Sequence, residues 1–172
     1  MASLTAQVNR RLASARVILT ELAAVPERPP FAEQALLEAG LFHLRCGYTH
    51  YLRELCAYYG VKYVAAINTE AEARKALELL DKQPAELAEL RQLAERPDSW
   101  VSQVVAGYRS CWVSDSAVAA PEIVAGAAPN NLIPTQRLDD VVQVQLTRSS
   151  LAEWLDEAQT LIMRHRQSST EC

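Results

Sequence analysis

The stretch 40–60 holds the residues of this sequence that could do metal or thiol chemistry. His43, Cys46 and His50 follow one another at spacings of three and four residues, and Glu54 comes four residues later. On a helix these spacings place the side chains along one narrow line. Imidazole and thiolate groups are ligands that zinc and copper prefer. The line is therefore a candidate metal or ligand site, and Tyr51 beside it is a further candidate ligand-binding residue.

A metal site at this place lacks part of its usual ligand set. A structural zinc site takes four protein ligands, and only Cys111 and His165 offer further donors of these types. Di-iron bundles use Glu-x-x-His pairs, and the sequence contains none. We therefore expect no cofactor and no metal, with His43, Cys46 and His50 as the residues that would hold an ion.

A catalytic role is also not favoured by the spacing of the reactive residues. Cys46 has His50 one turn away, and a nearby base activates a thiol. Both fall in the middle of a predicted helix, where no backbone N–H groups can bind an oxyanion. The carboxylates at 139–140 and 156–157 are adjacent pairs, which point about 100° apart on a helix. We expect no catalytic residue. The competing interpretation makes His43 and His50 half-covered, hydrogen-bonded boundary residues, with Glu54 or a helix-end carbonyl as partner.

The same stretch belongs to a long predicted helix, at about 31–59, which we expect at the centre of the fold. An unbroken apolar stripe runs along it: Leu37, Leu41, Leu44, Tyr48, Tyr51, Leu55 and Tyr58. This spacing is typical of a helix face turned toward the core. Gly40 and Gly47 lie beside the stripe. Because glycine costs helix stability, we expect a neighbouring helix to approach closely there, and the first helix is the expected neighbour.

The rest of the chain is also predicted to be helical. Only five glycines occur in 172 residues, and the Ala, Leu, Glu and Arg content favours helix. Apolar periodicity places helices at about 3–25, 69–83, 84–95 and 98–115, and a last one from 150 onward. The expected N-terminal caps are Ser3, Thr69 with Glu72, Asp98, and Ser150 with Glu153. The expected inward stripes are Val101, Val105, Tyr108 and Trp112 in the fifth helix, and Leu151, Leu155, Ala158, Ile162 and His165 in the last.

Two segments interrupt the helical pattern. Prolines and glycine between about 117 and 135 predict a long loop, whose apolar residues should pack it against the fold. The segment 136–147 fits a short helix or a strand, and we favour the helix. The sequence thus predicts an all-α fold: one domain over 1–172, a bundle of five or six helices around the long central helix.

Composition narrows the possible partners and the compartment. The formal net charge is −4, so the basic surface typical of nucleic-acid binding is missing. The sequence contains no long uncharged apolar window, so it predicts no membrane span. The cysteines form no CxxC pair, so neither a zinc knuckle nor a thioredoxin-like site is predicted, and in the cytoplasm they should be reduced thiols. We expect a cytoplasmic protein with no nucleic-acid partner and no membrane partner.

Part of the central helix resembles a known family. The run Glu38-Ala39-Gly40-Leu41-Phe42-His43-Leu44, followed by 51–55 (YLREL) and Tyr58-Tyr59, resembles a family of small uncharacterised helical proteins from Pseudomonas and related gammaproteobacteria. These motifs cover roughly the first sixty residues, and the remainder is similar in length and helix order. The resemblance implies a bacterial, cytoplasmic, all-helical protein of unknown function, and it supplies no catalytic residue.

The apolar character of the central helix points to an interaction surface. Ala39, Phe42 and Cys46 fall on its polar side, and Trp100 and Trp154 are expected at the borders of their stripes. A helix that is apolar nearly all round is central or buries a second face in another subunit. We predict a non-enzymatic protein that acts through a helical surface, as a homodimer or with a protein partner. The alternative is a small-ligand or metal-binding bundle with its site at the His/Cys edge.

Overall fold

The computed structural model describes residues 3–112 and 144–170, which form six α-helices and a short 3-10 turn without any strand. In chain order the helices are α1 (Leu4–Ala24), α2 (Pro30–Tyr58), α3 (Glu70–Glu78), α4 (Ala85–Glu95), α5 (Trp100–Ser110) and α6 (Arg148–Thr170). The predicted all-α bundle is confirmed. The predicted loop at 117–135 lies outside the described residues, as does most of 136–147. Residues 144–147 are described and have no regular structure, so the short helix favoured for this segment does not include them.

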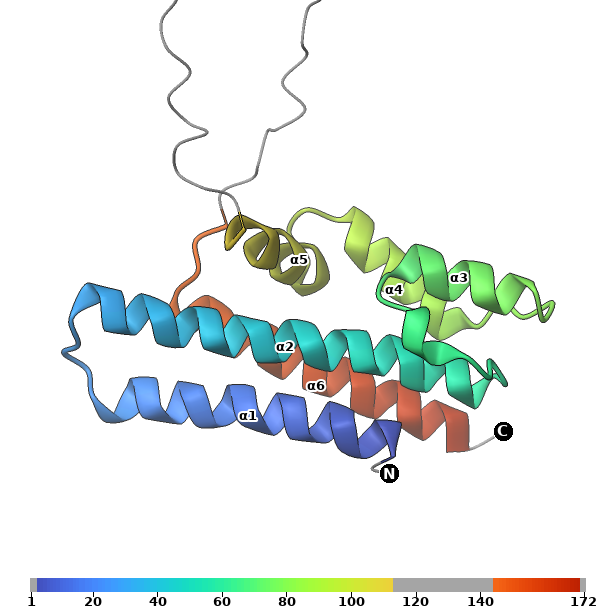
Figure 1. Cartoon of the computed structure of the whole chain (residues 1–172), viewed down its shortest axis with the longest axis horizontal. Helices are drawn as coiled ribbons and strands as arrows, with labels where there is room; N and C mark the ends of the chain where they lie inside the picture. Colours follow the sequence, from blue (N-terminus) through green and yellow to red (C-terminus); the bar gives the residue numbers. More distant parts are fainter. Residues whose placement is uncertain (1–2, 113–143, 171–172) are drawn as a thin grey trace, which may run out of the picture.

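Three long helices lie side by side along the molecule (Figure 1). α1 and α2 are antiparallel, and α6 runs in the same direction as α2. The start of α1 and the end of α6 therefore lie at the same end of the bundle. α2 contacts α1, α3, α5 and α6, which confirms it as the central helix. Within the described ranges no helix is long and apolar enough to cross a membrane.

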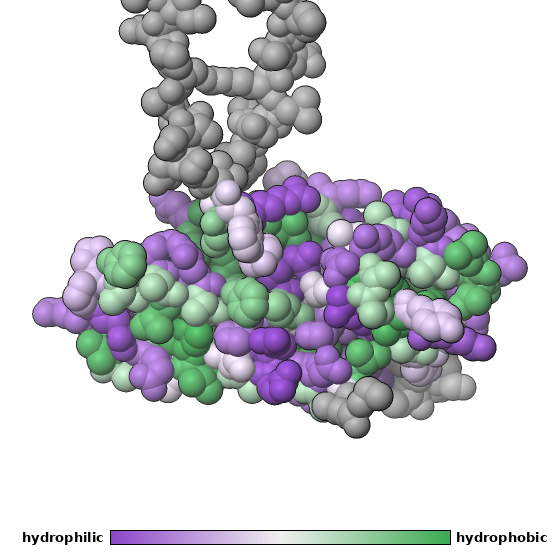
Figure 2. Space-filling model, viewed as in Figure 1, coloured by the Kyte–Doolittle hydropathy of each residue, from purple (hydrophilic) through white to green (hydrophobic). Residues whose placement is uncertain are grey.

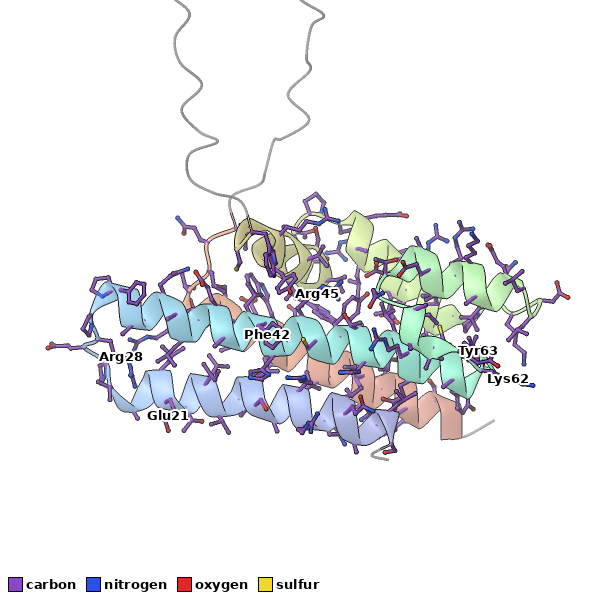
Figure 3. All side chains as sticks on the ribbon, in the orientation of Figure 1. Glu21, Arg28, Phe42, Arg45, Lys62 and Tyr63 are labelled. Atoms are coloured by element: carbon purple, nitrogen blue, oxygen red, sulfur yellow. The ribbon has the colours of Figure 1, made fainter. Side chains whose placement is uncertain are left out.

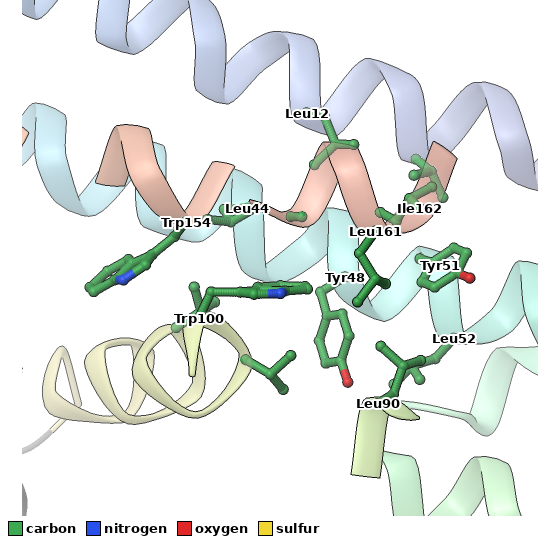
Figure 4. Packing of buried hydrophobic residues seen from close by; sticks show 14 of the residues in the cluster. Leu12, Leu44, Tyr48, Tyr51, Leu52, Leu90, Trp100, Trp154, Leu161 and Ile162 are labelled. Atoms are coloured by element: carbon green, nitrogen blue, oxygen red, sulfur yellow. The ribbon is translucent and has the colours of Figure 1, made fainter. Parts of the chain in front are cut away.

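The apolar stripe of α2 forms the middle of the core. All its predicted residues but one are buried: Leu37, Leu41, Leu44, Tyr48, Tyr51 and Leu55. Figure 4 shows Tyr48 and Tyr51 among side chains that include Leu90, Trp100 and Leu161. Tyr58 was predicted to join them and is instead 57% exposed. It is the last residue of α2, and a cavity adjoins it there.

The two glycines of α2 mark close approaches by two different helices. A Cβ atom at Gly47 would lie 3.1 Å from Leu12 Cδ2 of α1, so the expected neighbour is confirmed there. A Cβ atom at Gly40 would lie 2.6 Å from Leu151 Cδ2 of α6, whereas the nearest atom of Ile18 in α1 would be 3.5 Å away. At Gly40 the expectation was incomplete, because α6 makes the tighter contact.

Two helices begin as their capping residues predict. Ser3 caps α1 by accepting a hydrogen bond from the N–H of Ala6 at 3.1 Å. Thr69 and Glu72 form a reciprocal capping box at the start of α3. Such caps satisfy N–H groups that the first turn of a helix leaves unpaired, so these short local patterns were reliable guides to the helix starts.

Two other helix starts differ from the prediction. Ser99, and not Asp98, caps α5, since its Oγ accepts from the N–H of Ser102 at 3.2 Å. α6 begins at Arg148, and the reciprocal bonds predicted for Ser150 with Glu153 join Thr147 to Ser150 instead. Asp, Ser and Thr are all good N-caps, so composition does not decide which of several neighbours takes the position.

α5 is shorter than predicted and turns a different face inward. It ends at Ser110 and not near 115. Its buried residues are Trp100, Val101, Val104 and Gly107, whereas Val105 and Tyr108 are partly exposed and Trp112 is exposed beyond the helix. A Cβ atom at Gly107 would lie 3.3 Å from Leu41 Cδ2, so the small residue faces α2. Trp154 is buried like Trp100, so neither tryptophan sits at an exposed border.

Candidate functional site

The predicted edge of α2 lies where α2 meets α1. His43, Cys46 and His50 are partly buried, as boundary residues should be. α1 places Arg11 beside them: its Nη1 atom lies 3.3 Å from His43 Nδ1, and its guanidinium lies 5.8 Å from the centroid of the Phe42 ring. Because an arginine nitrogen only donates, His43 Nδ1 accepts this hydrogen bond.

Two arginines of α2 are held beside this edge by the loop that follows the helix. Arg45 donates to Asn68 O at 3.1 Å and also to the Thr49 hydroxyl. Arg53 donates through Nε to Ile67 O at 2.8 Å and through Nη2 to Asn68 Oδ1 at 2.7 Å. All these acceptors are uncharged. The hydrogen bonds therefore fix the directions of both guanidinium groups without neutralising their charges. Figure 3 labels Phe42 and Arg45 on this part of α2.

Together these side chains form a cationic surface that we call the arginine face. It comprises Arg10, Arg11, His43, Arg45, Cys46, His50 and Arg53. None of its four arginines forms an ion pair with a carboxylate in the part of the chain that the structure describes. Figure 2 shows hydrophilic residues gathered over the middle of the side where α1 and α2 lie.

The arginine charges act on the titratable groups between them. Burial lowers the pKa of His43, and the charge of Arg11 lowers it further. Burial also lowers the pKa of His50, with three arginines adding to the effect. Burial raises the pKa of the Cys46 thiol, and nearby arginines oppose that rise only in part. At neutral pH both histidines are therefore uncharged and Cys46 is protonated, so the charge of the face comes from its arginines.

The surroundings of these side chains suit an anion better than a metal cation. Among the described residues, no group of three or more His, Cys, Asp and Glu side chains is placed to hold a metal ion. A cation would also meet four unbalanced positive charges. Arg11 Nε and His50 Nδ1 are buried without a described hydrogen-bond partner, which leaves polar capacity inside the face. That His43, Cys46 and His50 bind a ligand stays a prediction.

Glu54 does not belong to the same site. Its carboxylate accepts from Arg166 Nη2 at 2.8 Å, from Arg166 Nε at 2.9 Å and from the Thr5 hydroxyl at 3.1 Å. It therefore joins α2 to α6 and α1. The competing interpretation gave the two histidines Glu54 or a helix-end carbonyl as partner. The described contacts of Glu54 go to Arg166 and Thr5 instead, and the arginine offers a bidentate, charge-assisted pair.

Tyr51 belongs to a buried chain of hydrogen bonds at the end of the bundle. Tyr51 Oη lies 2.6 Å from His165 Nδ1, and His165 Nε2 lies 2.9 Å from Glu89 Oε2. Tyr51 is 2% exposed and His165 is 5% exposed. A cavity of about 470 Å³ is lined by Tyr51, Glu54 and His165, among others. The five predicted residues thus divide between the arginine face and this cavity.

Several residues of these two sites were missed from the sequence. Arg53 follows His50 by three residues and Cys46 by seven, so the helical spacing that grouped those residues includes it. Arg10 and Arg11 carry no such signal, because they reach the face from another helix. Glu89 joins His165 across 76 positions of sequence, and no local pattern links the two.

Comparison with known proteins supplies a family and no activity. A sequence model described as "Family of unknown function (DUF6586)" matches residues 1–172. No curated protein and no solved structure matches the chain. The resemblance to a family of unknown function is confirmed, and it extends over the whole chain.

Proposed function

We infer the function of this chain, which belongs to the family of unknown function DUF6586, from its arginine face: it binds an acidic segment of a partner protein. The observation that supports this inference is the cluster of four arginines without a carboxylate partner among the described residues. The proposed role is a non-enzymatic, cytoplasmic interaction, in keeping with the expectations from the sequence.

The chemistry of the face favours carboxylates. A guanidinium group presents its donors in a planar fork that matches a carboxylate. Arg45 and Arg53 are already oriented by neutral acceptors, so binding costs them little side-chain freedom. Each exposed ion pair contributes only about 0–1 kcal/mol. Several pairs must therefore act together, and the binding should weaken as salt screens the charges.

The dimensions of the face favour a short segment. Arg53 lies eleven positions after Phe42 on α2, a distance of about 16 Å along the helix. An extended segment of about five residues covers that length. Phe42 is 41% exposed beneath Arg11, so the segment should combine acidic with apolar residues. The chain carries a net charge of −4, so a long nucleic acid would be repelled beyond the face.

A short fluorescein-labelled peptide that alternates glutamate and leucine tests the proposal by fluorescence anisotropy. Arg10→Glu should weaken binding at least about tenfold, a change of about 1.4 kcal/mol. Arg10 is exposed, so this substitution leaves the fold intact. The matched control is Arg74→Gln with Arg91→Gln, because those arginines already pair with Glu78 and Glu95. The control should bind the peptide as the wild type does.

Three results would decide against the proposal or redirect it. Equal affinities of the Arg10→Glu variant and the control would contradict it. So would tighter binding of a single-stranded oligonucleotide with the same number of charges. Sedimentation velocity on the unmodified protein shows whether the chain self-associates. An oligomer that Arg10→Glu dissociates would assign the acidic segment to a second copy of this chain.

A further inference from the structure

A second candidate site lies at the end of the bundle where α1 begins and α2 and α6 end. The cavity of about 470 Å³ there has a mainly apolar wall that includes Leu4, Leu55 and Ala57. A cavity of this size with few polar groups is typical of small-molecule sites. Its polar wall is made by Tyr51, His165 and the paired Glu54 and Arg166.

The hydrogen-bond chain fixes which way the Tyr51 hydroxyl points its proton. Glu89 also pairs with Arg164, and both interactions lower the pKa of its carboxyl group, with the His165 hydrogen bond as the larger cause. An ionised carboxylate only accepts, so the His165 tautomer that fits this chain carries its proton on Nε2 and donates it to Glu89. In that tautomer Nδ1 accepts from the Tyr51 hydroxyl. The lone pairs of Tyr51 Oη remain for a ligand that donates.

The charges around Tyr51 also select the ligand. Three carboxylates act on Tyr51, Glu54 on α2 and Glu86 and Glu89 on α4, against the charge of Arg166 on α6. Glu89 is itself paired with Arg164. Burial raises the pKa of the Tyr51 phenol, and these three carboxylates raise it further. Three carboxylates against two guanidinium groups leave a net negative charge on this wall, which favours a positively charged donor.

We propose that this cavity binds a small organic amine, whose ammonium group donates to Tyr51 Oη while its apolar body lies against Leu4, Leu55 and Ala57. Tyr58 also lines the cavity, and an aromatic ring attracts a cation. Glu89 is a positioning residue, because it acts on the ligand only through His165 and Tyr51. This site is separate from the arginine face, since no residue of that face lines the cavity.

Three probes of similar size test the proposal: phenethylamine, phenethyl alcohol and hydrocinnamate, which end in an ammonium, a hydroxyl and a carboxylate group. Ligand-observed NMR should rank the amine first and the carboxylate last. Tyr51→Phe keeps the ring and should weaken amine binding about tenfold, the effect of one charge-assisted hydrogen bond. Tyr48→Phe is the matched control. Tyr48 is equally buried, but its hydroxyl binds Glu70 Oε1 at 2.5 Å and lies outside the cavity.

Glu89→Gln should change which probe the cavity prefers, and a merely structural role of Glu89 would leave that preference unchanged. The glutamine amide can donate to His165 Nε2, which reverses the chain and frees the Tyr51 proton for an acceptor. The variant should lose its preference for the amine over the carboxylate. The proposal is overturned if the carboxylate binds tightest to the wild type or if Tyr51→Phe binds the amine as the wild type does. It is also overturned if no amine binding is detected at millimolar concentration.

Discussion

At the scale of single residues, His43 and His50 are bases held neutral by their surroundings. Burial and the arginine charges lower the pKa of both. The carboxylates of a bound peptide would offset those charges and raise both pKa values. Binding should therefore take up protons and grow tighter as the pH falls from about 7.5 toward 6, near the ordinary histidine pKa. Calorimetry in two buffers of different ionisation enthalpy measures the uptake. The double variant His43→Gln/His50→Gln should take up none, and equal uptake by variant and wild type would refute this role.

Glu89 is the residue whose ionisation should couple the cavity wall to stability. Its hydrogen bond from His165, and then its contacts with Arg164, lower its pKa below the ordinary value of 4.5. A lowered carboxyl pKa contributes stability above 4.5, and that contribution is lost as the pH falls through the folded-state pKa. At pH values below about 4.5, the urea concentration at the unfolding midpoint should therefore decrease more steeply with falling pH for the wild type than for Glu89→Gln. Parallel pH profiles of the two proteins would contradict the coupling.

Sequence reasoning named a part of each candidate site. The periodicity of one helix brought His43, Cys46 and His50 together, because those residues share a local face. The same reasoning attached Glu54 to them wrongly. Glu54 pairs with Arg166, which lies 112 positions away. Only the packing of α6 beside α2 brings the two residues together. Tyr51 was named without its partner His165 for the same reason.

At the scale of elements, the glycines of α2 set how closely the long helices pack. Gly40→Ala should destabilise the protein, although alanine favours a helix by about 1 kcal/mol. The new Cβ would lie 2.6 Å from Leu151 Cδ2, and Leu151 is fully buried. A double-mutant cycle with Leu151→Ala, measured by urea denaturation, should show favourable coupling, because the smaller residue makes room. If the stability losses of the two single variants simply add, the contact between positions 40 and 151 is not the source of the strain.

The helices themselves were largely predictable, and their ends were less so. α2 was expected at about 31–59 and spans Pro30–Tyr58, because the prolines before it and Gly60 after it, which has a φ of 97°, act locally. The inward face of α5 was predicted only in part: Val101 is buried, whereas Val105 and Tyr108 are partly exposed. Gly107, which packs against Leu41, belongs to that face as well. That contact depends on where α5 crosses α2, and periodicity within one helix does not contain this information.

At the scale of the whole molecule, the arginine face differs from the other arginines that join helices. Arg16, Arg148 and Arg166 each pair with a carboxylate on another helix, namely Asp156, Glu33 and Glu54. Those pairs fasten α6 to α1 and α2 within the bundle. In the arginine face, Arg45 and Arg53 are held by uncharged acceptors, and Arg11 donates to His43. The first set serves the fold, and the contrast supports the proposal that the second keeps its charge for a partner.

The central claim, that the arginine face binds an acidic partner, is tested most directly by the chain's own cysteines. Cys46 lies within the face, whereas Cys111 is exposed beyond α5 and serves as the internal control. Mass spectrometry can follow the alkylation of each thiol by N-ethylmaleimide with and without the glutamate–leucine peptide. We predict that the peptide slows the alkylation of Cys46 and leaves that of Cys111 unchanged. An unchanged rate at Cys46 under conditions where the peptide is bound would contradict the account.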